Sequence, residues 1–160
     1  MIPMSKYIFD SCSLIELCER YPYEIFPDIY DGIIFKMFET GELFSVTEVY
    51  EELRDSQEFW QDYKDYFRDL TIEESKNLDE ILSSEEFEVF RNWGMKENDG
   101  HWADPYLVAC AMGDSEIVVV SEESSLKNPQ RKIPYVCNKK GIRCIKLLEF
   151  FKEMNLQMFF

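Results

Sequence analysis

Short apolar runs alternate along this chain with longer stretches in which apolar residues recur at helical spacing. The clearest strand candidates are residues 7–9, 43–45, 117–120 and 142–145. The runs 7–9 and 117–120 contain no polar residue, which is typical of strands buried on both faces. Because helical stretches separate the strands throughout, we expect an α/β fold in which a parallel sheet has helices on both faces.

Several residues mark where the helices begin and end. Ser11 and Ser13 are candidate N-caps for the helix that follows the first strand. A second helix is predicted over residues 28–39, and Gly41 follows it as a C-terminal glycine would. The serine and glutamate in residues 45–48 have the spacing of a capping box, which predicts another helix start.

Residues 54–101 differ from the rest of the chain, because they are acidic, aromatic and helical in pattern and contain no strand-like run. Residues 71–74 and 83–86 have the composition of helix starts, and Gly94 and Gly100 are predicted helix breaks. We expect this segment to be a helical insertion or lid within a single domain.

Acidic residues recur just past the ends of the predicted strands. Asp10 ends the first strand, and Glu123 follows the strand at 117–120. Asp104 precedes Pro105, which is the order of an N-cap acid and an N1 proline at a helix start. Open α/β folds bind their ligands where the carboxyl ends of parallel strands meet. Asp10 is therefore a candidate site residue, although it could equally be a simple helix N-cap.

The composition is that of a globular protein. The chain has 160 residues, of which 46% are hydrophobic and 16% aromatic, so we expect one domain over residues 1–160 with a full core. No apolar run is long enough for a membrane span, and the start lacks the pattern of a secretory signal. The five cysteines include no CxxC pair, which indicates reduced thiols in a cytoplasmic protein.

The charge is unevenly distributed. The net charge is −15, yet residues 127–146 contain seven basic residues and no acidic one. Such a segment could follow the backbone of a polyanion even on an acidic protein, and Lys139, Lys140 and Arg143 are its candidate RNA-binding residues. The alternative is a solvated face that balances the acidic middle of the chain.

Four motifs together resemble a PIN domain over residues 6–150. The residues that carry the resemblance are a strand ending in Asp10, V-x-x-E-L at Val49, Glu52 and Leu53, A-D-P-x-x-x-A at Ala103, Asp104, Pro105 and Ala109, and V-V-S-x-E at Val119, Val120, Ser121 and Glu123. The chain is most similar to a PIN-like family of uncharacterised prokaryotic proteins related to VapC-type toxins. The resemblance implies a three-layer α/β/α fold with sheet order 3-2-1-4-5.

The same resemblance implies a metal-dependent endoribonuclease, with Mg²⁺ or Mn²⁺ as cofactor and RNA as substrate. Its catalytic residues would be Asp10, Glu52, Asp104 and Glu123, which would also bind the metal, with Ser121 as their polar neighbour. The family usually has Asp at the position of Glu123, so Glu122 or a bridging water could take that role. Asp99 is an outside candidate.

Metal chemistry suits these residue types independently. Magnesium and manganese prefer oxygen ligands and keep several waters, so two to four carboxylates around an open site are appropriate. A bound ion lowers the pKa of water, and a second can stabilise a leaving 3′-oxygen. The sole histidine, His101, could touch a phosphate, but such a histidine is more often only a loop residue.

Other interpretations compete with a nuclease. Cys137 and Arg143 have the C-x5-R spacing of cysteine phosphatases, but they precede a predicted strand instead of following one. Asp10-Ser11-Cys12 is similar to the start of a haloacid-dehalogenase-like phosphatase but lacks the second aspartate. The main rival is a catalytically silent PIN-like module that binds RNA or a protein partner such as an antitoxin. A homodimer is a further candidate assembly, and no membrane partner is expected.

Overall fold

A computed structural model describes residues 5–98, 102–124 and 126–155. Its centre is a five-stranded parallel sheet in the order β3-β2-β1-β4-β5, which confirms the predicted α/β fold and sheet order. The strands are β1 (Lys6–Phe9), β2 (Leu43–Val46), β3 (Phe67–Arg68), β4 (Ile117–Val120) and β5 (Cys144–Ile145). In the central pair, Phe9 is in register with Val120, so β1 and β4 end at the same level.

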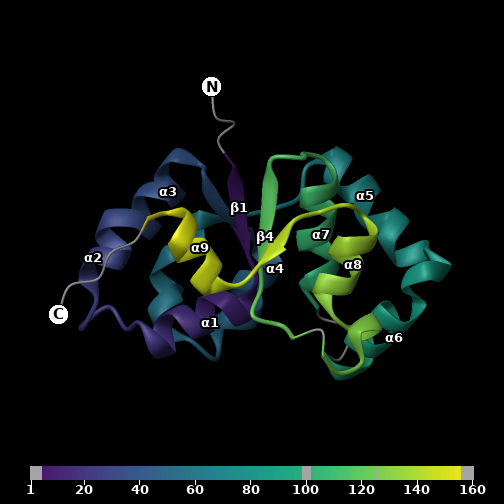
Figure 1. The fold of residues 1–160 in the computed structure, drawn as a ribbon, viewed down its shortest axis with the longest axis horizontal. Coiled ribbons are helices and arrows are strands. Elements are labelled where there is room, and N and C mark those ends of the chain that lie inside the picture. Colours follow the sequence, from purple (N-terminus) through teal and green to yellow (C-terminus); the bar gives the residue numbers. More distant parts are fainter. Residues whose placement is uncertain (1–4, 99–101, 125, 156–160) are drawn as a thin grey trace.

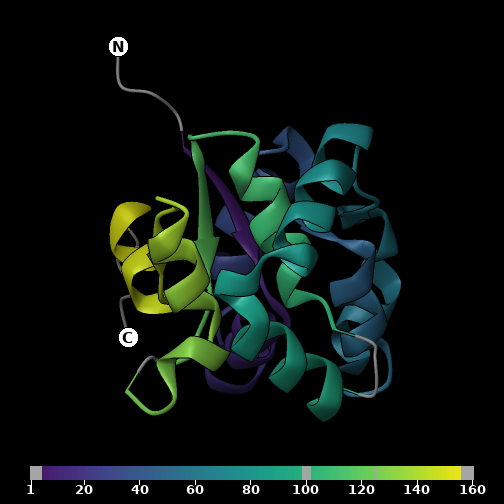
Figure 2. The same ribbon diagram turned by 90° about the vertical axis from the view of Figure 1, so that its right-hand side faces the viewer.

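Helices lie on both sides of this sheet, which makes three layers (Figure 1). On one side are α1 (Ser11–Arg20), α2 (Pro27–Ile29), α3 (Phe35–Thr40) and α9 (Leu147–Glu153). On the other are α5 (Ile72–Ser83), α6 (Glu88–Glu97), α7 (Asp104–Met112) and α8 (Ile133–Lys139). Helix α4 (Thr47–Arg54) follows β2 and contacts α1. Figure 2 shows the C-terminal segment in yellow at one edge of the molecule and the blue and teal segments at the other.

Shorter helical turns connect these elements. A π-helical turn, η1 (Tyr30–Ile34), joins α2 to α3, and 3-10 turns occur as η2 (Glu58–Tyr66), η3 (Glu85–Phe87) and η4 (Pro129–Arg131). The helix predicted over 28–39 is therefore present as α2, η1 and α3, and its middle turn is π-helical. Gly41 ends it at φ 80°, a left-handed conformation that glycine adopts without a steric penalty. No helix in the described ranges is long and apolar enough to cross a membrane.

The core lies between the sheet and the helices. Ile8, Phe9 and Val119 are fully buried, which confirms the prediction of strands covered on both faces. Helix α7 is apolar on nearly every side and packs between the sheet and α5. On the opposite face, the ring of Phe150 meets the ring of Phe9 edge-on at 4.9 Å. The carboxyl ends of β1 and β4 are therefore held by packing from both layers.

The helix predicted after residues 45–48 is present, but its predicted capping box is wrong. Ser45 does not cap a helix, because it lies buried in β2, and its hydroxyl donates a hydrogen bond to the backbone oxygen of Phe9. Helix α4 begins at Thr47 without a side-chain cap. The serine therefore ties two neighbouring strands together where local sequence predicted a helix cap.

The segment 54–101 is only partly as predicted. The helix start predicted at residues 71–74 is confirmed as the beginning of α5, where Thr71 and Glu74 form a capping box. The segment is nevertheless not free of strands, because Phe67–Arg68 forms β3 on the edge of the sheet. Gly94 is not a break but a buried residue inside α6, where an added Cβ would lie 2.2 Å from the ring of Trp102. Gly100 lies outside the described residues.

Candidate active site

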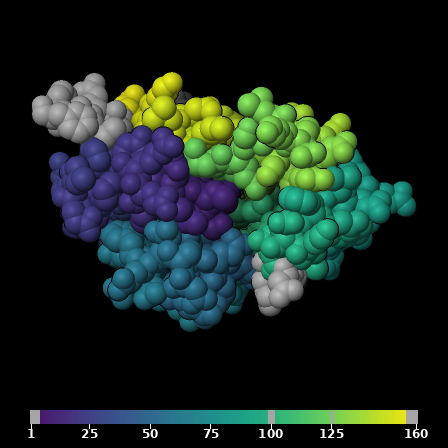
Figure 3. All heavy atoms as spheres, turned by 90° about the horizontal axis from the view of Figure 1, so that it is seen from below, coloured from purple at the N-terminus to yellow at the C-terminus, as the bar shows by residue number. Residues whose placement is uncertain are grey.

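Four carboxylates that are distant in the sequence gather at the carboxyl edge of the sheet. Asp10 follows β1, Glu123 follows β4, Asp104 begins α7 and Glu52 lies on α4. Partial burial of the thiol of Cys12, an exposed residue on α1, and then the charges of all four carboxylates raise its pKa, so all four act on one point. Figure 3 looks onto this edge, where the purple, blue and green segments border a hollow. The structure thus brings together all four residues that the PIN resemblance selects.

Asp10 is both a helix cap and a buried acid. Its Oδ1 accepts hydrogen bonds from the backbone N–H and the hydroxyl of Ser13, each at 2.8 Å, so Asp10 and not Ser11 or Ser13 caps α1. Its Oδ2 is buried and meets no donor at hydrogen-bonding geometry in the part of the chain that the structure describes.

The environment of Asp10 favours its protonated form. Burial raises its pKa to about 7, and the charge of Glu123 adds to that rise. The nearby hydroxyls of Ser121 and Ser13 and the Ser13 amide moderate it. One carboxyl oxygen is therefore committed to the fold, while the other remains available to a ligand.

Glu52 is held in place by two different segments. Its Oε2 accepts a hydrogen bond from the hydroxyl of Ser11 at 2.5 Å, and its Oε1 accepts one from the backbone N–H of Ala103 at 2.7 Å. These bonds connect α4 to the beginnings of α1 and α7. Glu52 thus fixes the spacing of the helices that carry Asp10 and Asp104 at their starts.

Asp104 is not the helix cap that the Asp-Pro pair predicts. The N-cap of α7 is Ala103, whose backbone is already helical, and Asp104 forms no capping hydrogen bond. Burial raises the pKa of Asp104 well above its ordinary value, and the negative charges of the other three carboxylates add to that rise. A hydrogen bond with the Trp102 side chain opposes it. The side chain is therefore directed to the cluster instead of to its own helix.

Glu122 and Glu123, although adjacent, serve different helices. Oε2 of Glu123 accepts a hydrogen bond from the Ile133 N–H at the start of α8, at 2.8 Å. Oε1 of Glu122 accepts one from the Leu147 N–H at the start of α9, at 2.6 Å. The charge that acts on Asp10 and Asp104 is that of Glu123. The geometry therefore favours Glu123 over Glu122 as the fourth carboxylate.

Ser121 lies between the strand and the cluster. It is buried, and its hydroxyl oxygen accepts a hydrogen bond from the Glu123 N–H at 3.2 Å. Asp99 and His101, the remaining candidates from the sequence, lie outside the described residues.

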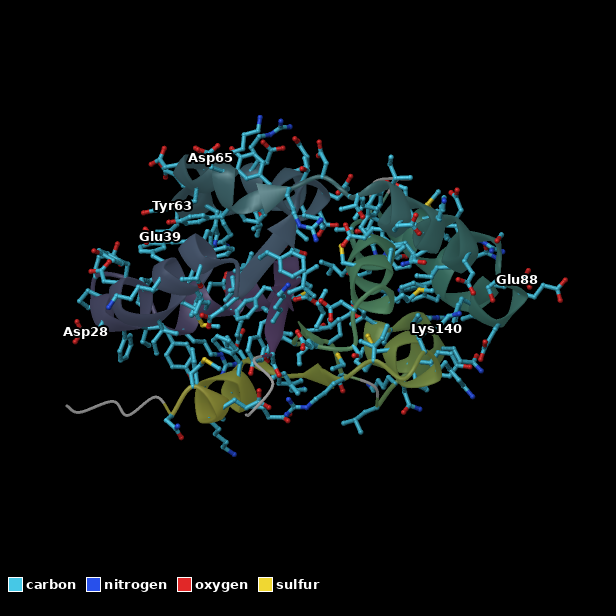
Figure 4. The ribbon with its side chains drawn as sticks, turned by 90° about the horizontal axis from the view of Figure 1, so that it is seen from above. Asp28, Glu39, Tyr63, Asp65, Glu88 and Lys140 are labelled. Carbon is cyan, nitrogen blue, oxygen red and sulfur yellow. The ribbon has the colours of Figure 1, made fainter. Side chains whose placement is uncertain are left out.

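The predicted RNA-binding residues are not at this edge. Lys139 ends α8 and residues 140–143 form the turn between α8 and β5 (Figure 1), at the end of α8 opposite to Ile133, which Glu123 contacts. Lys140 lies 3.4 Å from Glu80 of α5, beside the helices on that side of the sheet (Figure 4). Arg143 pairs with Glu153, and Lys139 lies over the ring of Tyr135 at 5.6 Å.

Other residues of the basic segment lie nearer to the carboxylates. Lys146 follows β5 and shares a surface cavity of about 360 Å³ with Ser121 and Glu123. Arg131 and Lys132 immediately precede Ile133, whose N–H is bonded to Glu123. The sequence did not single them out, although the position of Lys146 just after the predicted strand at 142–145 would have pointed to it.

The carboxylate oxygens of the cluster are the donors that hard cations prefer, but they are not arranged as a complete metal-binding site. Within residues 5–98, 102–124 and 126–155, no three histidine, cysteine, aspartate or glutamate side chains already form a group shaped to hold an ion. The unpartnered Oδ2 of Asp10 and an all-oxygen donor set still fit Mg²⁺ or Mn²⁺. Magnesium is commonly held by one or two carboxylates, with water and phosphate at its other positions.

A cleft of about 690 Å³ opens beside Glu52. We call it the Trp102 cleft, and its apolar wall includes Leu82, Met95, Trp102 and Tyr106. Glu48 and Glu51 of α4 also line it. Glu52 therefore belongs both to the carboxylate cluster and to the wall of this cleft.

One comparison with known proteins produced a match. The family model DUF4411, described as a domain of unknown function, matches residues 7–158. No curated protein and no solved structure matched. The match covers nearly the whole chain, and its description names no activity.

Proposed function

We propose that this chain, which belongs to the DUF4411 family, is a metal-dependent endoribonuclease of the PIN, VapC-like type that acts in the cytoplasm. One observation supports this above all others, namely the convergence of four carboxylates with Asp10 and Asp104 buried among them. Burying like charges together costs stability, and strongly perturbed acids in a hollow are typical of functional sites. A divalent cation would offset that cost.

Asp10, Glu52, Asp104 and Glu123 would hold Mg²⁺ or Mn²⁺. The cation, when bound, supplies an acidified water and neutralises charge on the phosphate. Glu52 and Glu123 keep their places through backbone N–H bonds, so they present carboxylates of fixed position. The free Oδ2 of Asp10 is the oxygen that can turn to a ligand without losing a hydrogen bond.

The reaction is the addition of water across a phosphodiester bond. Water attacks phosphorus in line with the leaving 3′-oxygen, the P–O3′ bond breaks, and the 3′-oxygen leaves with a proton. The products are a 5′-phosphate and a 3′-hydroxyl. The basic segment 127–146 would follow the RNA backbone, with Lys146 close to Glu123 and with Lys139, Lys140 and Arg143 at phosphates farther away.

The test is cleavage of a single-stranded RNA in Mn²⁺ or Mg²⁺, with and without EDTA. We expect cleavage that EDTA abolishes and that Asp104→Asn lowers by at least a hundredfold. Glu116→Gln is the matched control, because Glu116 is an exposed carboxylate at the opposite end of β4. Wild-type protein that cleaves equally well in EDTA, or not at all with either metal, would contradict the proposal.

A silent binding module is the second candidate, and two observations favour it. Glu52 and Glu123 already accept backbone hydrogen bonds, so part of the cluster's role is to connect helices. The net charge is strongly negative, and the exposed residues Asp28 and Glu88 lie at opposite ends of the molecule (Figure 4). Such a surface would suit a basic protein, for example an antitoxin, or a second copy bound through the basic segment. RNA or protein binding without cleavage would support this alternative.

A further inference from the structure

We propose that the Trp102 cleft binds one nucleobase of the RNA and that it prefers guanine. This inference rests on the proposed function: the bound base would belong to the nucleotide next to the scissile phosphate. The cleft volume of about 690 Å³ lies within the usual range of small-ligand sites. Its position is set by Glu52, which borders both the cleft and the carboxylate cluster.

The apolar wall of the cleft suits a flat aromatic ring. Trp102 and Tyr106 come from α7 and the residues just before it, and Leu82 and Met95 come from α5 and α6. The ring of Trp102 is held by Phe90, with centroids 4.4 Å apart. Proteins commonly bind unstacked RNA bases by stacking them on such side chains.

The charge of the cleft excludes a phosphate. Glu48, Glu51 and Glu52 line one face of α4, at spacings of three and four residues. Arg54 is the sole basic residue among the described lining residues, and it is already paired with Glu51 at 2.9 Å. A phosphate would be repelled there, whereas an uncharged base would not. We therefore place the base in the cleft and its phosphate at the carboxylate cluster.

The same carboxylates select a base by its hydrogen-bond donors. An ionised carboxylate only accepts hydrogen bonds, and its two oxygens can serve two adjacent donors. Guanine presents two adjacent donors, N1–H and the N2 amino group, beside its O6 acceptor, whereas the pairing edges of adenine, cytosine and uracil have no two adjacent donors. Glu48 lines the cleft, and its Oε2 is buried without a donor partner in the described part of the chain, so a small turn of the side chain towards the cleft would supply the donors it lacks. It is the acceptor we assign to guanine.

Binding is best tested without turnover. Calorimetric titration of the metal-free full chain in EDTA should show binding of guanosine, with inosine at least fivefold weaker because it lacks the N2 amino group. Glu48→Gln should weaken guanosine binding at least fivefold, while Glu116→Gln should not change it. Adenosine bound as tightly as guanosine would overturn the guanine preference.

A second pair of variants does not depend on Glu48. Met95→Trp would fill the cleft from an exposed position and should abolish guanosine binding, whereas Val89→Trp, on the same helix but outside the cleft, should leave it unchanged. An arginine-rich peptide that binds the cleft, with no nucleoside binding, would overturn the inference. RNA cleavage without guanosine binding would overturn the assignment of the cleft but not the proposed nuclease activity. Guanosine binding without RNA cleavage would support the cleft assignment and overturn the nuclease.

Discussion

Two buried acids in this protein, Asp10 and Glu74, have opposite environments. Glu74 lies at the start of α5 and accepts two hydrogen bonds from the guanidinium of Arg68, at 2.7 and 2.9 Å. It also completes the capping box with Thr71, and the pKa of its carboxyl is lowered to about 2, chiefly by the bonds from Arg68. Asp10 has no cationic partner among the residues that the structure describes, and burial raises its pKa to about 7.

Glu74 is therefore an acid whose ionised form stabilises the fold, whereas the ionised form of Asp10 destabilises it. A buried charge is stabilising only when a partner and hydrogen bonds replace the water it loses. Glu74 has both, so its role is complete without any ligand. Asp10 has a helix-capping bond at one oxygen, while within the described residues its buried Oδ2 meets no donor at hydrogen-bonding geometry and only the nearby Ser121 hydroxyl moderates its pKa. The metal that we propose would complete this environment.

The largest expected effect is on the pH dependence of stability in EDTA. The pKa of Asp10 is raised in the folded state, so folded protein binds more protons than unfolded protein between about pH 4 and pH 7. Its contribution to stability therefore falls as pH rises through that window, by on the order of 4 kcal/mol. Asp10→Asn should remove most of this fall, since Asn caps helices nearly as well as Asp.

Urea unfolding of wild type and Asp10→Asn at pH 5 and pH 8 checks this directly. Glu116→Gln controls for loss of a surface charge. If the free energy of unfolding changed equally with pH in wild type and Asp10→Asn, the raised pKa would not belong to Asp10.

The second effect is stabilisation by metal. A divalent ion at 100 times its dissociation constant should add about 2.7 kcal/mol, which is roughly 5–10 °C in melting temperature for a domain of this size. Asp104→Asn removes one repelling charge, so it should melt above wild type in EDTA yet lose most of the Mg²⁺ or Mn²⁺ shift. Thermal melts with and without metal measure both. Wild-type melting that ignores both ions would count against a metal site.

The third effect tests the paired acid. Arg68→Ala leaves the Glu74 carboxylate buried without its cation and should destabilise the fold by about 2 kcal/mol, discounted because Arg68 is partly exposed. Because the pKa of Glu74 is lowered in the folded state, the stability it contributes is present above about pH 4.5 and is lost as pH falls through 2. Acid titration of wild type and Arg68→Ala measures that loss. The rise in melting temperature on adding metal should be equal in wild type and Arg68→Ala. Loss of that rise in Arg68→Ala would show that the Glu74 region and the carboxylate cluster are not independent.

The smallest effect separates two adjacent acids. Glu122→Gln should cost less than about 1 kcal/mol, since the amide oxygen can still accept the Leu147 N–H. It should keep the full metal shift, whereas Glu123→Gln should lose most of it. Thermal melts of both variants with Mn²⁺ measure the contrast. An equal loss of the shift in the two variants would mean that Glu122 also reaches the cluster.

The sequence alone determined the features that depend on neighbouring residues. Apolar runs at 7–9 and 117–120 predicted buried strands, and the composition of residues 71–74 predicted the start of α5. Gly41 likewise predicted a helix end, because its left-handed backbone conformation depends only on the residue itself and its neighbours. The carboxylates after the strand ends were likewise visible, because parallel strands bring their carboxyl ends to one edge.

Only the tertiary structure decided which partner each polar group has. Ser45 bonds to a neighbouring strand instead of capping α4, and Asp104 turns to the cluster because Ala103 is already helical. The two-residue strand β3 has too little periodicity of its own and exists through its pairing with β2. Glu122 and Glu123 are chemically identical neighbours whose partners lie on different helices, 25 and 10 residues away in the chain. Such partners are chosen by how whole layers pack, because a hydrogen bond or a desolvation cost depends on what lies nearby in space.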